Sequence, residues 1–101
     1  MLNRFHIMLT LIIYDISEDK PRKKLSDYLL DRGLFRVQYS SFVGDLNYHD
    51  RKVMEAEMKK FLTSEQDSVI IVPICKNCFR QHKILSNVEK RLVHTDEVEF
   101  A

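Results

Sequence analysis

Hydrophobic and polar residues follow one another along this chain in blocks whose spacing switches between that of strands and that of helices. The block IMLTLIIY at residues 7–14 is almost continuously apolar and is rich in β-branched and aromatic residues. Such a run is typical of a strand in the middle of a sheet, so we predict a central strand that is buried on both faces.

A helix is predicted to follow this strand. Asp19 is expected to cap its N-terminus and Pro21 to occupy its first turn, where a missing backbone N–H is tolerated. The apolar positions that follow recur at helical spacing, and Gly33 is suited to end the helix in a left-handed conformation. Residues 34–44 (LFRVQYSSFVG) return to strand-like alternation, and Ser40–Ser41 indicates either a bulge or a break into two short strands.

The second half of the chain repeats this alternation. A second helix is predicted from about Asp50 to Leu62, and a further buried strand from Ser68 to Ile74. Pro73 has no backbone N–H to donate, which limits that strand to an edge of the sheet or places Pro73 at the end of the strand. Residues 93–100 are expected to form a short extended segment on a sheet edge. The inner face of the second helix is predicted to consist of Met54, Met58, Phe61 and Leu62.

The predicted order β-α-β(β)-α-β indicates an α+β sandwich in which two helices cover one face of an antiparallel sheet. The 101 residues suffice for one domain, assigned to residues 1–85, with a tail at residues 86–101. Hydrophobic residues make up 45% of the chain and charged residues 31%, a composition that excludes a disordered protein. The longest apolar run is far shorter than the ~20 residues of a membrane helix. No cleavage site of a secretory signal follows that run, so we expect a cytoplasmic protein without a membrane partner.

Cys75 and Cys78 form a C-x-x-C pair, and His82 follows four residues later. A structural zinc site needs four ligands, and the remaining histidines are scattered along the chain. A redox role would place the pair at the start of a helix after a strand, in a wider β-α-β context that this sequence lacks. We therefore interpret both cysteines as reduced thiols.

The net charge of +1 conceals a segregation of charge along the chain. Six basic residues and two acids lie between Lys20 and Arg36, and five basic residues and one acid lie between Lys76 and Arg91. Local basic stretches attract a phosphate backbone more than the net charge does, although two solvated helix faces would give the same composition. The candidate nucleic-acid-binding residues are Lys20, Arg22, Lys23, Lys24 and Arg36.

Asp15 ends the predicted first strand, where loops beyond a sheet often hold ligands. Its carboxylate is a hard oxygen ligand suited to Mg²⁺ or Mn²⁺, and the alternative is an acid that accepts backbone N–H bonds in a turn. One acid alone is a poor metal site. A two-fold dimer would bring Asp15 from each subunit together, where a cation would bridge their like charges. Metal binding and dimerisation would then depend on each other.

Several segments together resemble one family: Y-D-I at residues 14–16, Arg22, G-L-F-R-V-Q-Y-S-S-F-V-G-D-L at 33–46 and V-I-I-V-P-I at 69–74. They are similar to the Cas2 family of small CRISPR-associated adaptation proteins. The resemblance covers residues 8 to about 85, and the stretch 33–46 is its most specific part. It implies a ferredoxin-like βαββαβ fold, a homodimer, and a role in acquiring new spacers alongside the CRISPR-associated integrase.

The resemblance also implies a set of site residues. The metal-binding acid of the family falls on Asp15, and arginines associated with cleavage match Arg22 and Arg36. Lys24 stands where an Arg can occur, which keeps the charge but loses the bidentate fork. By its own residue type, Phe42 is either a core aromatic or a surface on which a base stacks. The implied catalytic residues are Asp15, Tyr14, Arg22, Arg36 and Phe42, with Asp15 as the metal ligand.

Two functions remain open on this basis. The first is a dimeric Mg²⁺-dependent endonuclease, with Mn²⁺ as a second suitable ion, acting on single-stranded RNA or double-stranded DNA. The second is a non-catalytic dimeric scaffold that binds DNA and bridges the integrase subunits. Both predict nucleic-acid binding that weakens steeply with salt. The resemblance further implies that residues 1–7 are an extension or a misassigned start, and that the tail at 86–101 pairs with the partner's sheet or docks the integrase.

Overall fold

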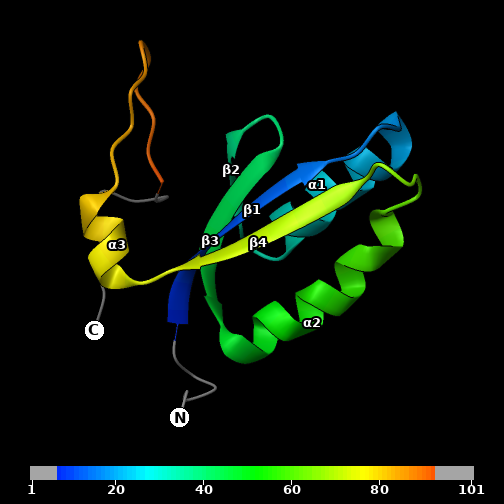
Figure 1. The fold of residues 1–101 in the computed structure, drawn as a ribbon, viewed down its shortest axis with the longest axis horizontal. Coiled ribbons are helices and arrows are strands. Elements are labelled where there is room, and N and C mark those ends of the chain that lie inside the picture. The colour runs from blue at the N-terminus through cyan, green and yellow to red at the C-terminus, as the bar shows by residue number, and fades with distance from the viewer. Residues whose placement is uncertain (1–6, 93–101) are drawn as a thin grey trace.

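The computed structural model describes residues 7–92, which form a four-stranded sheet with helices packed on it (Figure 1). The elements are β1 (Ile7–Asp15), α1 (Asp19–Asp31), β2 (Phe35–Gln38), β3 (Ser41–Asn47), α2 (Tyr48–Met58), the 3₁₀ turn η1 (Lys59–Phe61), β4 (Ser68–Ile74) and α3 (Lys76–Gln81). The strand order is β2-β3-β1-β4, and every neighbouring pair is antiparallel. This is the ferredoxin-like βαββαβ arrangement, so the predicted fold class is confirmed.

The main core lies between the sheet and the helices α1 and α2. Side chains alternate along a strand, so Ile12 and Tyr14 of β1 share one face, and Phe42 joins them because it is the β3 partner of Ile12. These three side chains are almost completely buried. The helices complete this core with Leu25 and Leu29 of α1, Met54 and Met58 of α2, and Phe61 of η1.

The opposite face of the sheet is covered along part of its length. Phe79 of α3 packs against Leu9 of β1 and Val43 of β3, and all three are buried. Further along β1, Ile13 is 36% exposed. The prediction of a central strand is therefore confirmed. The prediction that both faces of this strand are buried holds near Leu9, but in a single chain it is wrong at Ile13.

Helix α1 ends as its sequence predicts and begins differently. At its end Gly33 has φ +88°, and its N–H bonds to the Leu30 carbonyl while the N–H of Leu34 bonds to Leu29, which forms a Schellman motif. At its start the capping position belongs to Glu18, whose side chain makes no cap hydrogen bond. The prediction that Asp19 caps the helix is wrong, because Asp19 is already inside the first turn.

The strand-like residues 34–44 form two strands, not one. The chain turns at Tyr39 and Ser40, so the break proposed at Ser40–Ser41 is present, and the register shifts between Arg36 and Gln38 as in a bulge. The carbonyl of Ser40 accepts a hydrogen bond from the N–H of Tyr14, at 3.0 Å. This bond attaches the β2–β3 turn to the end of β1.

Strand β4 lies at an edge of the sheet, in agreement with the restriction imposed by Pro73. Pro73 lies opposite Thr10 of β1, and among the described residues β4 pairs with β1 alone. An edge strand tolerates a residue that has no backbone N–H, because only one of its sides takes part in the ladder.

Helix α2 begins two residues before the predicted start, because the side chain of Asn47 accepts a hydrogen bond from the N–H of Asp50 at 2.7 Å. The last predicted turn is the tighter η1, after which the backbone becomes extended at Leu62. Leu62 is 36% exposed, so its assignment to the inner face is wrong. The remaining predicted inner-face residues are buried: Met54, Met58 and Phe61.

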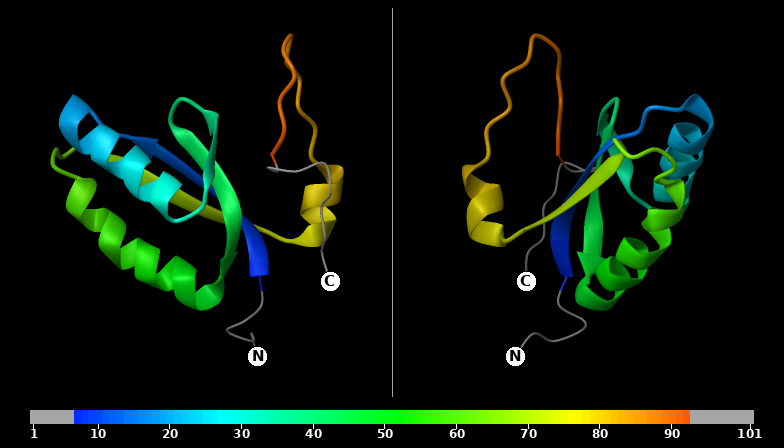
Figure 2. Two further views of the ribbon diagram at one scale, coloured as in Figure 1. Left: turned by 180° about the vertical axis from the view of Figure 1, so that it is seen from behind. Right: turned by 45° about the vertical axis from the view of Figure 1, so that its right-hand side comes forward.

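Helix α3 has no counterpart in the sequence prediction. It is short, and it lies across the sheet from α1 and α2 (Figure 2). After it, residues 82–92 contain no helix or strand, and the Lys90 ammonium donates to the Val37 carbonyl of β2 at 3.3 Å. The predicted extended segment at 93–100 lies outside the described residues, so pairing of the 86–101 tail with a partner subunit stays a prediction.

Candidate nucleic-acid and metal site

Asp15 is the last residue of β1 and is exposed at the end of the open face of the sheet. Its neighbour Tyr14 lies in the core, so strand alternation directs Asp15 to the face opposite α1 and α2. Within residues 7–92 the Asp15 carboxylate makes no hydrogen bond or ion pair, and no three His, Cys, Asp or Glu side chains are grouped to hold a metal ion. The alternative that Asp15 accepts backbone N–H bonds in the turn is therefore wrong for this part of the chain.

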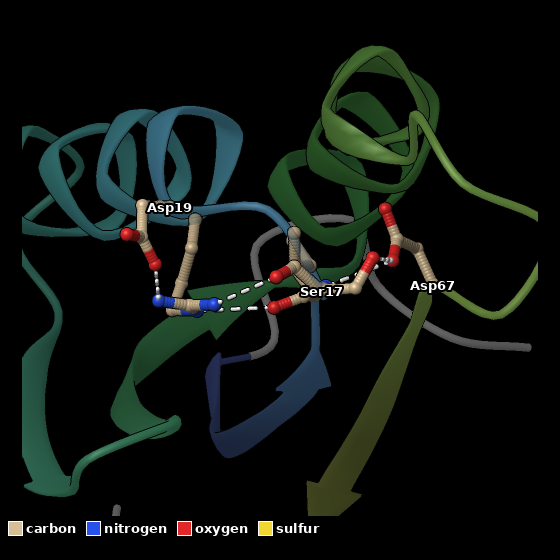
Figure 3. A network of polar contacts seen from close by, with 5 residues as sticks. Ser17, Asp19 and Asp67 are labelled. Carbon is tan, nitrogen blue, oxygen red and sulfur yellow. Dashed lines mark hydrogen bonds and ion pairs between the residues drawn. The ribbon is translucent and has the colours of Figure 1, made fainter.

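The turn that follows Asp15 is held by Arg22. Its guanidinium donates to the carbonyl of Ile16 at 3.0 Å and to that of Ser17 at 3.1 Å, and it forms an ion pair with Asp19 at 2.6 Å. Figure 3 shows these contacts between the start of α1 and the turn. The hydrogen bond to Asp19 is the main cause that raises the pKa of Arg22. At least three of the five N–H donors of this arginine thus serve the fold.

Asp67 fixes the same turn from the other side, and the sequence analysis did not single it out. One carboxylate oxygen accepts from the N–H and hydroxyl of Ser17, both at 3.0 Å (Figure 3). The other accepts from the N–H groups of Thr63 and Ser64. These hydrogen bonds lower the pKa of Asp67, and the bond from the Ser17 N–H has the largest effect. Asp67, directly before β4, is thus the acid that accepts backbone N–H bonds in a turn, the role considered for Asp15.

A cationic pocket of about 420 Å³ opens between the first half of α1 and the β2–β3 turn. Arg22, Lys23 and Arg36 contribute three positive charges against one carboxylate, that of Asp19. Tyr39 of the turn also contributes to the wall. A pocket with this charge balance suits an anion such as a phosphate group. The full lining is Tyr14, Asp19, Arg22, Lys23, Ser26, Arg36 and Tyr39.

Arg36 is held in this pocket by aromatic rings. Its guanidinium carbon lies 4.9 Å from the ring centre of Phe42 and 5.8 Å from that of Tyr39, and it donates to the Tyr39 carbonyl at 2.9 Å. Phe42 is fully buried and stacks on Tyr14, with ring centres 6.2 Å apart. The structure thus favours the core alternative for Phe42, which borders the pocket through Arg36. Burial raises the pKa of Tyr14, and the nearby Arg36 opposes this.

The predicted lysines do not form one cluster with the arginines. Lys23 lines the pocket and forms an ion pair with Asp27 at 2.9 Å. Lys20 and Lys24 instead line a separate groove of about 670 Å³ between α1 and η1, together with Lys60. The candidate nucleic-acid-binding residues are therefore divided between two surfaces, the pocket and the groove, on either side of α1.

The structure brings together four of the five predicted catalytic residues and separates the fifth. Tyr14, Arg22 and Arg36 line the pocket, and Phe42 lies behind Arg36, whereas Asp15 is absent from its lining. Tyr39 is the pocket residue that sequence reasoning missed. The sequence did hold a signal for it. Tyr39 directly precedes Ser40–Ser41, so a break between two strands at that pair places Tyr39 in the connecting turn.

The two cysteines lie away from this pocket, at the start of α3. Cys75 is the N-terminal cap, and its Sγ accepts a hydrogen bond from the N–H of Cys78 at 3.4 Å. Hydrogen bonds from Cys78 lower the pKa of Cys75, and the Cys75 side chain raises that of Cys78. Both are free and exposed thiols. The helix start that a redox role would require is present, although the sequence pattern gave no sign of it.

Comparison with known proteins identifies the family. The sequence profile described as CRISPR associated protein Cas2 matches residues 8–82, which is most of the chain. The chain belongs to the Cas2 family. The resemblance is confirmed, and the matched region contains α1, α2 and the strands β2, β3 and β4 in full, and β1 from Met8 onward.

Individual Cas2 relatives agree with this assignment. The chain is 42% identical over 93 residues to the CRISPR-associated endoribonuclease Cas2 1 of Archaeoglobus fulgidus, covering 92% of this chain and 99% of the relative. It is 36% identical over 78 residues to the CRISPR-associated endoribonuclease Cas2 of Desulforudis audaxviator, covering 77% and 74%.

Solved structures share the fold as well. A hypothetical protein TT1823 from Thermus thermophilus superposes with a TM-score of 0.69 at 25% identity, covering 84% of this chain and 99% of that one. A crystal structure of a Cas2 protein gives 0.61 at 25% identity, covering 94% and 98%. No helix within residues 7–92 has the length and apolar character needed to cross a membrane.

Proposed function

We propose that this Cas2-family chain acts as a homodimer that cleaves phosphodiester bonds of RNA or DNA with the help of Mg²⁺, in the acquisition of CRISPR spacers. The observation that carries the proposal is the place of Asp15, an exposed acid at the end of an apolar strip on the open face of the sheet. The relatives from Archaeoglobus fulgidus and Desulforudis audaxviator, both named endoribonucleases, support the choice of reaction. RNA is therefore the first substrate to test.

The apolar strip supports the dimer. Ile13 is 36% exposed, Ile70 is 54% exposed and Val72 is 37% exposed, and register places all three on the same face as Asp15. A single chain leaves this surface in water, which is unfavourable by about 25 cal/mol for each Å² of apolar area. A second copy would cover it through a two-fold axis, and such an isologous interface pairs each residue patch with itself.

The donor chemistry at Asp15 fits Mg²⁺ or Mn²⁺ once two chains are considered. These ions take one or two carboxylates and fill their remaining positions with water and phosphate oxygens, so a pair of exposed Asp15 side chains is a sufficient protein contribution. The ion, when bound, would stabilise charge that develops on the reacting phosphate. It would also neutralise the repulsion between the two carboxylates.

The pocket residues would bind and orient the nucleic-acid backbone. Arg36 and Lys23 present positive charge to a phosphate, and Arg22 adds charge while it fixes the turn that carries Asp15. The Tyr14 phenol lines the pocket and, as a neutral hydroxyl, would donate a hydrogen bond to a phosphate oxygen. Lys20 and Lys24 would contact a neighbouring part of the backbone along α1.

One observation favours a second candidate, a dimeric scaffold that holds DNA and bridges the subunits of the CRISPR integrase. Asp15 is absent from the lining of the cationic pocket. The pocket could therefore bind phosphate groups whether or not Asp15 holds a metal ion. Under this second function Asp15 would contribute to the dimer, and the basic residues alone would carry the biological role.

The test is a cleavage assay on labelled RNA and DNA with Mg²⁺ or EDTA, comparing the wild-type protein with Asp15→Asn. Asp45→Asn is the matched control, since Asp45 is an exposed aspartate of β3 on the same sheet face. We expect cleavage by the wild type and the control in Mg²⁺, and none by Asp15→Asn, whose affinity for nucleic acid stays equal or rises. Cleavage that survives Asp15→Asn would overturn the role of Asp15 as the metal ligand, and nucleic-acid binding without cleavage by any variant would favour the scaffold over the nuclease.

A further inference from the structure

Tyr39 is the most exposed large aromatic residue of the pocket and stands at its rim. It lies in the β2–β3 turn, and 68% of its surface is open to solvent. The turn itself is anchored, because the Ser40 carbonyl bonds to the N–H of Tyr14 and the Tyr39 carbonyl bonds to Arg36. An aromatic ring is thus held in water, on a fixed support, beside the three cations of the pocket.

Tyr39 also ends a series of stacked planar groups that begins in the core. Tyr14 stacks on Phe42, the Arg36 guanidinium lies 4.9 Å from the Phe42 ring centre, and the same guanidinium lies 5.8 Å from that of Tyr39. The series continues from buried to exposed groups, so a further planar group could be added at its outer end. The exposure of Tyr39 shows that Arg36 covers just a part of its ring.

We propose that the exposed ring of Tyr39 is a stacking platform for an unpaired nucleobase of the nucleic acid whose phosphate occupies the adjacent pocket. This inference rests on the proposed function, in that it assumes nucleic acid as the ligand, and it adds a specificity residue to that function. Base stacking on aromatic rings tolerates every base because each has a π-face. Tyr39 would therefore select for unpaired bases without selecting a sequence, since a base inside a duplex is already stacked on its neighbours.

A second exposed tyrosine lies beside cations but away from the pocket. Tyr48 is 42% exposed, and both Arg51 and Lys52 lie within 6 Å of its ring centre, at 5.8 and 5.4 Å. Tyr48 begins α2, at the end of β3 remote from the β2–β3 turn, and it lines neither the cationic pocket nor the groove along α1. It offers the same chemistry without a phosphate site beside it, which makes it the matched control.

The experiment measures equilibrium binding of short single-stranded oligonucleotides by full-length protein, at one fixed salt concentration and without divalent ions. Two ligands are compared, an ordinary oligonucleotide and one of the same length with abasic sites, which keeps the phosphates and removes the bases. The variants are Tyr39→Ala, Tyr39→Phe and Tyr48→Ala. Thermal unfolding of each variant is recorded, and the exposed position of Tyr39 predicts little change in it.

We expect Tyr39→Ala to weaken binding of the ordinary oligonucleotide about 5- to 150-fold, the range for loss of one stacked base. Binding of the abasic ligand should be equal for the wild type and Tyr39→Ala, and the salt dependence should keep its slope because no phosphate contact is lost. Tyr39→Phe and Tyr48→Ala should bind like the wild type.

Equal affinity of Tyr39→Ala and the wild type for the ordinary oligonucleotide would overturn the stacking role, and so would an equal loss on the abasic ligand. Either result leaves the cleavage proposal intact, because salt-dependent binding by the wild type would persist. Failure of the wild type to bind either ligand would instead overturn nucleic-acid binding itself, and the stacking role with it.

Discussion

Ile13 of β1 and Ile70 of β4 lie opposite each other in the antiparallel register, on the sheet face that α1 and α2 do not cover. Both side chains are exposed, and Val72 continues the strip along β4. Asp15 follows two residues after Ile13 on the same face, opposite Ser68. An apolar contact surface and a candidate metal ligand therefore share one face and one end of the sheet.

This relationship predicts that Ile70→Asp converts a dimer into a monomer. A charge at a two-fold axis meets its own copy, and like charges across an interface cost several kcal/mol, so the dissociation constant should rise at least about 100-fold. Sedimentation velocity over a range of concentrations measures the change. Leu30→Asp is the control, because Leu30 is 50% exposed on α1, on the other side of the sheet. A wild type that sediments as a monomer, or a dimer that survives Ile70→Asp, would show that the strip is not the interface.

The contacts of Arg22 and Arg36 predict different consequences for their replacement by Gln. Arg22 bonds two backbone carbonyls of the β1–α1 turn, so Arg22→Gln should lower the melting temperature by several degrees as well as weaken nucleic-acid binding. Arg36 is exposed and bonds one carbonyl in its own hairpin. Arg36→Gln should leave the melting temperature nearly unchanged and reduce the slope of log affinity against log salt by about 1. The pattern would be contradicted if Arg36→Gln destabilised the protein more than Arg22→Gln does.

Asp67 predicts a pH dependence of stability. Its pKa is lowered in the folded protein, so its contribution is fully present above the unfolded value of about 3.9 and is lost as the pH falls through the lower folded value. Asp67→Asn should therefore melt below the wild type at pH 7, and the difference should shrink at acidic pH once the wild-type carboxyl is protonated. Melting curves from pH 7 to pH 3 test this. Glu65→Gln, an exposed substitution in the same loop, serves as the control, and a difference that grows on acidification would contradict the assignment.

Periodicity predicted the elements of the main core, because burial against α1 and α2 imposes regular spacing on many residues at once. Gly33 was readable for a local reason, since a helix end needs a left-handed residue and glycine adopts it without strain. Helix α3 was not readable. It buries little apart from Phe79, and its start depends on the cap at Cys75. Its sequence therefore carries too few apolar positions at helical spacing to predict a helix.

The sequence predicted individual residues of the candidate site but not how they are arranged in space. The segments that resemble the family located Asp15, Arg22 and Arg36, yet strand alternation sends Asp15 to the face opposite the pocket. The contact between Ser17 and Asp67 joins residues 50 positions apart, and no local pattern announces such a pair. Tyr39 became visible as a pocket residue when the turn placed it beside Arg36.

The proposed metal site requires two Asp15 side chains to meet across the dimer axis and hold one divalent ion. Counting Mn²⁺ bound to the protein by electron paramagnetic resonance tests this most directly, with Asp15→Asn and Ile70→Asp measured in parallel. We predict one Mn²⁺ for every two wild-type chains and no binding at this site by either variant. One ion for every chain, retained when Ile70→Asp is a monomer, would contradict the shared site.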